Sequence, residues 1–158
     1  MTDPTRSIAR FVATLATLGD KLGPVLFQLP PHWRMNLERL QTFLRALPAG
    51  LRCAFEFRDP SWFEPETYET LAAFNAAFCV YDLTGQKSPA VRTADFVYIR
   101  LHGPDAPYRG HYAPRVLRRW ANQCTRWIDA GVTVYCYFDN DEAGYAVRDA
   151  LALAQLIG

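Results

Sequence analysis

The sequence predicts an α/β protein built on one parallel sheet, and three observations lead to this class. Short apolar segments alternate along the chain with longer segments whose apolar residues recur every three or four positions, as strands and helices do in such folds. The chain has 158 residues, 50% of them apolar, which suits a single domain with a sizeable core. No glycine-rich nucleotide-binding loop follows the first strand-like segment, so a nucleotide-binding open sheet is not favoured.

The bounds of the predicted elements come from residues that commonly begin or end helices and strands. Asn36 can cap a helix through its side-chain oxygen, and Pro65 suits the first turn of another helix. Pro48 and Gly131 each end a helical pattern. The helices are predicted at residues 5–22, 37–47, 65–76, 115–129 and 145–157, and the strands at residues 25–29, 51–57, 78–82, 95–103 and 132–138.

These elements form one helix followed by five strand–helix units, which we assign to a single domain over residues 1–158. Residues 83–93 are rich in turn formers and link the third predicted strand to the fourth. Alternating units imply right-handed crossovers, so the sheet is either open and doubly wound or part of a (β/α)₈ barrel. A complete barrel needs eight units and typically about 250 residues, so this chain alone can form only part of one.

The composition gives no sign of a membrane or a polyanionic partner. The chain carries 17 basic and 16 acidic residues, so contact with nucleic acid would need a local basic patch. No apolar run approaches the roughly 18 residues that span a bilayer, and no signal-peptide pattern opens the chain. The four cysteines show no C-x-x-C spacing, and we expect reduced thiols. These features predict a cytoplasmic protein without membrane contact.

Polar side chains follow every predicted strand, at the edge of the sheet where parallel α/β folds place their functional sites. The clearest case is the segment 95–103, DFVYIRLHG, in which Arg100 and His102 share one face of a strand that should be buried. Glu56 and Arg58 share one face of the second strand in the same way. The remaining strand ends supply Gln28, Tyr81, Asp82, Tyr137, Asp139 and Asn140.

These residue types predict proton transfer on an anionic ligand. Glu56 and His102 are the candidate acid–base residues, and Arg58 and Arg100 are suited to hold an anionic group. An ion pair between Glu56 and an arginine is the structural alternative, because buried charges persist when they are paired. The three histidines lack H-x-x-x-H and H-E-x-x-H spacing, so no metal site is predicted. A metal held by Glu56, His102 and Asp139 is the weaker alternative.

Two other groups of residues have functional and structural interpretations. Four loop aromatics could stack on a sugar or a base, although each alone is more typical of a core: they are Trp33, Trp62, Tyr108 and Tyr112. A basic group surrounds the start of the helix at 115–129, where a solvated helix face is the simpler interpretation: it comprises Arg109, His111, Arg115, Arg118 and Arg119.

Four stretches carry a resemblance to a known family: LGPVLFQLPP (22–31), AFEFRDPSWF (54–63), FVYIRLHGP (96–104) and VYCYFDNDEAGYAVRDA (134–150). In this order they resemble the domain-of-unknown-function 72 family, also called YecE-like proteins. The resemblance implies a TIM-type barrel of which this chain forms the last five of eight units, with nothing in residues 1–21 that corresponds to the first three. It also implies a pocket at the carboxyl ends of the strands, formed by Gln28, Glu56, Arg58, Trp62, Arg100, His102, Tyr137, Asp139 and Asn140.

The resemblance assigns no reaction and no cofactor, and two classes of function stay open. The first is a hydrolase-like enzyme that processes phosphodiesters or sugar phosphates. The second is a binding module for nucleic acid or a sugar phosphate, without catalysis. A partial barrel could also be an inactive truncated product, and its open sheet edges would favour self-association.

Overall fold

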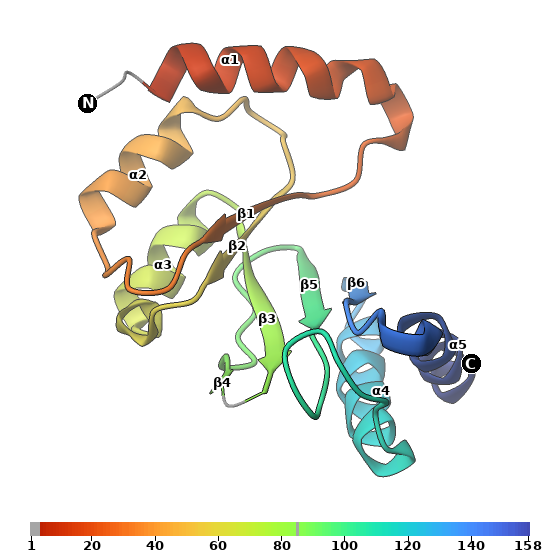
Figure 1. Cartoon of the computed structure of the whole chain (residues 1–158). Coiled ribbons are helices and arrows are strands. Elements are labelled where there is room, and N and C mark those ends of the chain that lie inside the picture. The colour runs from red at the N-terminus through yellow and green to blue at the C-terminus, as the bar shows by residue number, and fades with distance from the viewer. Residues whose placement is uncertain (1–3, 85) are drawn as a thin grey trace.

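The centre of the molecule is a parallel sheet of five main strands (Figure 1). The structure is a computed structural model that describes residues 4–84 and 86–158. The strands are β1 (Val25–Leu29), β2 (Cys53–Phe57), β3 (Ala77–Leu83), β5 (Phe96–Leu101) and β6 (Thr133–Phe138), paired in that order and all parallel. The short strand β4 (Gln86–Lys87) pairs antiparallel with β3. The predicted α/β class with a parallel sheet is confirmed.

The helices lie close to the predicted ranges. They are α1 (Pro4–Leu15), α2 (Leu37–Ala46), α3 (Pro65–Ala73), α4 (Pro114–Asp129) and α5 (Tyr145–Ile157), with 3₁₀ turns η1 (Ala16–Lys21), η2 (Pro60–Trp62) and η3 (Glu142–Gly144). Asn36 caps α2 as predicted, because its side-chain oxygen accepts a hydrogen bond from the backbone N–H of Arg39 at 2.9 Å. The first helix is shorter than predicted, since Gly19 has a φ of 51° and interrupts the helical backbone.

The connection between β3 and β5 corrects the expectation of five strand–helix units. Its described residues contain β4 and irregular backbone, and none of them is helical. Side chains hold this connection against the sheet instead. The hydroxyl of Thr93 donates to the carbonyl of Ala76 at 2.6 Å and accepts from the N–H of Phe78 at 2.7 Å. The hydroxyl of Ser88 accepts from the N–H of Tyr81 at 2.8 Å.

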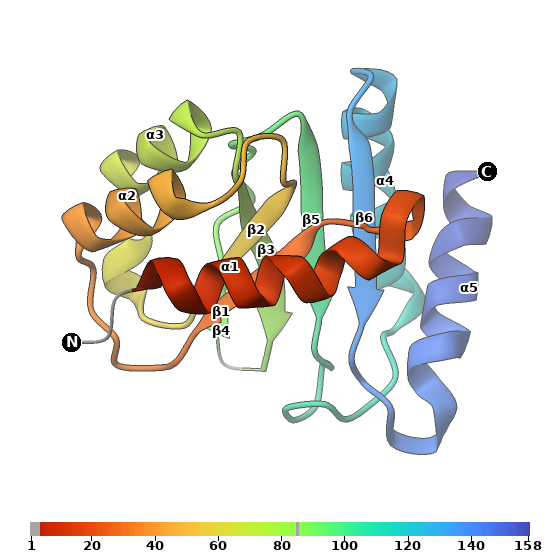
Figure 2. The ribbon, with the colours of Figure 1, turned by 90° about the horizontal axis from the view of Figure 1, so that it is seen from above.

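The helices that follow β1 pack against one face of the sheet. Phe55 and Phe57 of β2 pack with Leu71 of α3 in one hydrophobic cluster. Ile99 of β5 and Leu117 of α4 belong to a second cluster. Figure 2 shows the main strands side by side, with α2 and α3 towards one end of the sheet and α4 and α5 towards the other. Because side chains alternate along a strand, the residues between these apolar positions face the opposite side.

The opposite face is concave, as contacts between distant strands show. Nη1 of Arg52, just before β2, donates a hydrogen bond to the hydroxyl of Tyr135 on β6 at 2.8 Å. Small and aromatic side chains cover this face towards the amino-terminal ends of the strands, namely Ala54, Ala77, Cys79, Phe96 and Tyr98. The charged residues of the strand ends therefore meet on the concave side.

No helix in the described part of the chain is both long enough and apolar enough to cross a membrane.

Candidate functional site

A buried carboxylate at the end of β2 is the centre of the candidate site. The side chain of Glu56 is fully buried. Its Oε2 accepts a hydrogen bond from Nη1 of Arg100 at 2.8 Å, and its Oε1 forms an ion pair with Arg58. The predicted ion pair is therefore present, with two arginines instead of one. We call Glu56, Arg58, Arg100, His102 and Asp139 the Glu56 cluster.

Arg100 joins the two ends of the sheet. Its Nη1 also donates to Oε1 of Gln28 on β1 at 3.0 Å, and its Nη2 lies 3.0 Å from Oδ2 of Asp139, which follows β6. One guanidinium thus contacts residues from the first, second and last main strands or the loops that follow them. Arg100 can make all of these contacts because the curvature of the sheet brings its edges together at the carboxyl ends of the strands.

His102 is fully buried between the two carboxylates of the cluster. Its Nε2 lies 3.1 Å from Nη2 of Arg58 and 3.5 Å from Oε1 of Glu56, while its Nδ1 lies 3.2 Å from Oδ2 of Asp139. The rings of Tyr81 and Tyr108 lie roughly perpendicular to the imidazole, with ring centroids 6.3 Å and 5.4 Å away. The imidazole of His102 is therefore held in place by both carboxylates, by Arg58 and by the two tyrosine rings.

The surroundings of Glu56 keep its carboxylate ionised. Burial opposes the charge, but hydrogen bonds from His102 and Arg100 and the positive charges of Arg58 and Arg100 outweigh it, so the pKa of Glu56 falls to about 2. At neutral pH, Glu56 is a fixed negative charge that positions two arginines and a histidine. The cluster also raises the pKa of a neighbouring thiol, because burial and the charge of Glu56 keep Cys79 protonated.

Besides Gln28, which contacts Arg100, three of the predicted ligand-binding residues lie outside the Glu56 cluster. Trp62 is buried on the helix side of the sheet, where it stacks on Phe57 with ring centroids 4.4 Å apart. Tyr137 stands beside Arg100 in the pairing of β5 with β6 and is 43% exposed. Asn140 is buried and donates to the carbonyl of Gly110 at 2.8 Å, which ties the loop after β6 to the loop after β5. The structure therefore brings together Gln28 and the five residues of the cluster, with Tyr137 next to them.

Sequence reasoning missed two residues that shape the site, Cys79 and Asp149, and it placed Tyr81 at a strand end without giving it a role. Cys79 and Tyr81 alternate on β3 and face the cluster. The Cys79 thiol lies 3.6 Å from Oε2 of Glu56, and the guanidinium of Arg58 lies 5.0 Å from the centre of the Tyr81 ring. Strand alternation could have placed both of them on this face. The other missed residue is Asp149, a buried carboxylate on α5 that accepts a hydrogen bond from Nδ2 of Asn140 at 2.7 Å. No sequence pattern around a single aspartate within a helix predicts such a contact.

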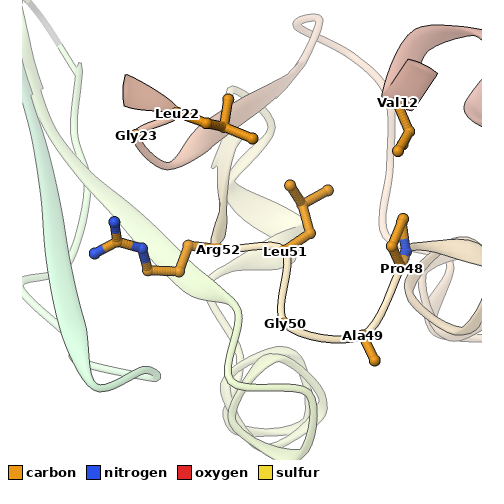
Figure 3. A pocket seen from close by; sticks show the side chains of 8 residues that line it. All are labelled: Val12, Leu22, Gly23, Pro48, Ala49, Gly50, Leu51 and Arg52. Atoms are coloured by element: carbon orange, nitrogen blue, oxygen red, sulfur yellow. The ribbon is translucent and has the colours of Figure 1, made fainter. Parts of the chain in front are cut away.

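Two pockets lie elsewhere on the molecule. One, of about 270 Å³, is close to the amino-terminal ends of β1 and β2 (Figure 3). Its lining is mainly apolar, with one charged side chain: Val12, Leu22, Gly23, Pro48, Ala49, Gly50, Leu51 and Arg52. The other, of about 420 Å³, lies between α4 and the connection that contains β4. Among the described residues, no group of three or more histidine, cysteine, aspartate or glutamate side chains is arranged to hold a metal ion.

Comparison with known proteins finds relatives that are longer than this chain. The chain is 27% identical over 166 residues to the UPF0759 protein YunF of Bacillus subtilis, in a match that covers 87% of this chain and 58% of that protein. The crystal structure of a DUF72 family protein from Thermotoga maritima superimposes with a TM-score of 0.88 at 25% identity, and a DUF72 family protein from Enterococcus faecalis does so with a TM-score of 0.88 at 18% identity. Each superposition covers 99% of this chain and 66% of the other.

The chain thus spans 58% of the length of the curated relative and 66% of the length of the solved structures. The family described as "Protein of unknown function DUF72" matches residues 1–158, so the chain belongs to the DUF72 family.

Proposed function

We propose that this chain is a single YecE-like domain with the architecture of a partial TIM-type barrel, equivalent to the last five of eight strand units. The placement of the helices supports this architecture, because those after β1 pack on one face of the sheet, whereas an open doubly wound sheet carries helices on both faces. The concave opposite face and the 66% coverage of the solved relatives support it as well.

We further propose that the Glu56 cluster binds a small anionic ligand that carries a phosphate group, and that it belongs to an enzyme that processes phosphodiesters or sugar phosphates. The observation that carries this proposal is the ionised, buried Glu56 with two arginines and a histidine around it. Burying so many charged groups is costly, and such departures from an apolar core are typical of functional sites. In this proposal His102 transfers protons, and Glu56 and Asp139 hold it between them.

The donors that remain in the cluster favour phosphate as the ligand group. Nε of Arg58 is buried and has no hydrogen-bond partner among the described residues, and the side chain of Arg100 is 17% exposed. A guanidinium offers planar pairs of N–H groups that match phosphate oxygens. A phosphate at this rim would therefore meet the guanidinium of Arg100, the more accessible cation of the cluster.

Binding of inorganic phosphate and ribose 5-phosphate, measured by isothermal titration calorimetry, tests the proposal. Arg100→Gln should weaken binding about tenfold, since a hydrogen bond to a charged group contributes about 1.5 kcal/mol or more. Arg118→Gln is the matched control, because Arg118 is an exposed arginine on α4. Equal affinities in the wild type and both variants, or no binding to either probe, would contradict the proposal. Hydrolysis of bis(4-nitrophenyl) phosphate by the wild type and by His102→Gln tests the enzymatic part.

A non-catalytic module for single-stranded nucleic acid is the second candidate, and one observation favours it. Tyr137 is exposed beside Arg100 and stacks on Tyr98 with ring centroids 5.0 Å apart, so its ring could extend the stack to a base. Oligonucleotide titrations at two salt concentrations separate the candidates, because phosphate-backbone binding weakens steeply as salt rises. Salt-dependent binding that Tyr137→Ala reduces, without hydrolysis, would favour this module.

We also propose a cytoplasmic location. The four cysteines form no disulfide in the structure, and three of them are buried. Reduced, buried thiols are typical of proteins in a reducing compartment.

A further inference from the structure

A second group of polar side chains lies at the same rim, centred on the buried carboxylate of Asp149. Its Oδ2 accepts hydrogen bonds from the backbone N–H of Tyr112 at 3.1 Å and from Nδ2 of Asn140 at 2.7 Å. Its Oδ1 forms an ion-pair contact with Nδ1 of His111 at 2.6 Å and has no hydrogen-bond partner among the described residues. A proton on Nδ1 of His111 would satisfy this buried carboxylate oxygen.

Solvent can reach the imidazole of His111. The side chain of His111 is 49% exposed, whereas His102 and Glu56 are fully buried. A neutral imidazole that is protonated on Nδ1 has its lone pair on Nε2, and that lone pair can accept a proton. At this rim, the His111 side chain is therefore more accessible to a ligand than the His102 side chain.

Tyr145 packs on His111, and an arginine lies on the same helix as Tyr145 and another in the same loop as His111. The ring of Tyr145 stacks on His111 with centroids 5.4 Å apart, and the guanidinium of Arg148 lies 5.9 Å from the centre of the same Tyr145 ring. Arg109, two residues before His111, is 65% exposed and pairs with Glu142 at 3.0 Å. Arg109 is already paired with a carboxylate, so the class of ligand is taken from the proposed function.

We propose that His111 and Asp149 form a second acid–base pair at the carboxyl rim. In this pair, Asp149 positions the imidazole, and Nε2 of His111 takes a proton from a hydroxyl of a phosphate-bearing ligand. The resulting imidazolium keeps its Nδ1 proton directed at Asp149, which stabilises the positive charge. The inference rests on the proposed function only for the class of ligand, since the pair itself follows from the contacts of His111 and Asp149.

The tautomer of His111 in the wild-type protein is the first test, and it requires no substitution. Nitrogen-15 NMR of the imidazoles at about pH 8, where most histidines are neutral, distinguishes the two tautomers. We expect His111 to be protonated on Nδ1. Protonation of the neutral ring on Nε2 would overturn the proposal, even if phosphate bound at Arg100 as proposed above.

The variant Asp149→Asn tests the role of the carboxylate. Tyr112 and Asn140 would engage the new amide oxygen, so the amide NH₂ would face His111 and favour the opposite tautomer. Carbethoxylation by diethyl pyrocarbonate reports the nucleophilicity of Nε2. We expect His111 to react about tenfold more slowly in this variant, as expected when a carboxylate partner of an imidazole is lost. An unchanged rate for His111, with the fold intact by circular dichroism, would overturn the proposal.

The other two histidines provide internal controls for the reagent. His32 is exposed and His102 is fully buried, so mass spectrometry of the modified wild type should show the order His111, His32, His102 from fastest to slowest. Inorganic phosphate should slow the modification of His111 and leave His32 unaffected. Equal protection of both histidines, or of neither, would overturn the assignment of a phosphate-bearing ligand to this pair.

Discussion

At Glu56, burial and ion pairing act in opposite directions, and the balance determines what a substitution does. Removing the charge leaves Arg58 without its anion in a buried place and leaves Arg100 with Asp139 alone. Breaking a buried ion pair on one side typically costs about 3 kcal/mol or more. We expect Glu56→Gln to lower the free energy of unfolding by about 3 kcal/mol, as measured by urea denaturation.

Glu69→Gln is the matched control for this variant, since Glu69 is an exposed glutamate on α3. Its effect should stay within about 0.5 kcal/mol. Similar stabilities for the two variants would show that the ion pairs of Glu56 contribute nothing net.

The low pKa of Glu56 also predicts how stability depends on pH. The pKa falls from 4.5, its ordinary value, to about 2 in the folded protein. A group with a lower pKa in the folded state stabilises the fold above its unfolded pKa and loses this contribution as the pH falls towards the folded value. Between pH 4.5 and about 2, the wild type should lose about 3 kcal/mol more than Glu56→Gln. Parallel profiles in urea denaturation across this window would contradict the prediction.

At the residue scale, the sequence predicted side chains that act along one strand and missed those that act between elements. Alternation on the strands placed Glu56 with Arg58 and Arg100 with His102, and both pairs occur in one cluster. Trp62 followed a strand in sequence but is turned into the core by η2, which no pattern in the loop revealed. The roles of individual site residues stay predictions.

Among the connecting elements, the loop between β5 and α4 depends on a glycine at its start. Gly103 has a φ of 110°, and a Cβ there would come within 2.7 Å of the backbone nitrogen of Arg109 and still closer to its carbonyl oxygen. The loop also carries His111, so a displacement would affect the rim. We expect Gly103→Ala to lower the free energy of unfolding by about 3 kcal/mol, from backbone strain and overpacking together.

Gly50→Ala separates these two contributions. Gly50 has a φ of 79°, but a Cβ there would meet nothing within 4 Å. This control should lose only about 1 kcal/mol, the cost of the left-handed conformation alone. Equal losses in the two variants by thermal or urea denaturation would show that the loop yields without cost at Gly103.

Elements with strong periodicity were predicted to within a few residues, and the irregular ones were not. The helix predicted at 115–129 is α4 (Pro114–Asp129), and the helix predicted at 145–157 has the same bounds as α5. The connection after β3 has no such period. Its contacts with the sheet pass through Thr93 and Ser88, and side-chain contacts of this kind are set by the folded structure, which local spacing does not encode.

For the whole molecule, the two ends of the sheet are the least covered parts. Within the described sheet, β1 and β6 each pair with a single neighbour. Apolar side chains are exposed on the helices at both ends, including Phe11 on α1 and Val147 and Leu151 on α5. Unpaired strand edges beside apolar surface favour association with another strand. We therefore expect the purified chain to self-associate in a concentration-dependent manner.

A lysine on the edge strand β6 tests this expectation. Thr133 is exposed, and Thr133→Lys should weaken self-association about tenfold, equivalent to about 1.4 kcal/mol, when followed by sedimentation equilibrium. Asn122→Lys adds the same charge on the exposed face of α4 and should leave the association unchanged. A monomer at every concentration would contradict the expectation, and circular dichroism on the same samples would show whether the chain melts cooperatively.

The long-range contact of Arg100 affects the order in which parts of the protein fold. Gln28 and Arg100 are 72 positions apart in the chain, so their hydrogen bond is a late and entropically costly closure. The carboxyl rim is thus complete only after β1 and β5 have both taken their places in the sheet. A small molecule that binds this guanidinium would bind only the folded protein, and it would therefore raise the melting temperature of the protein.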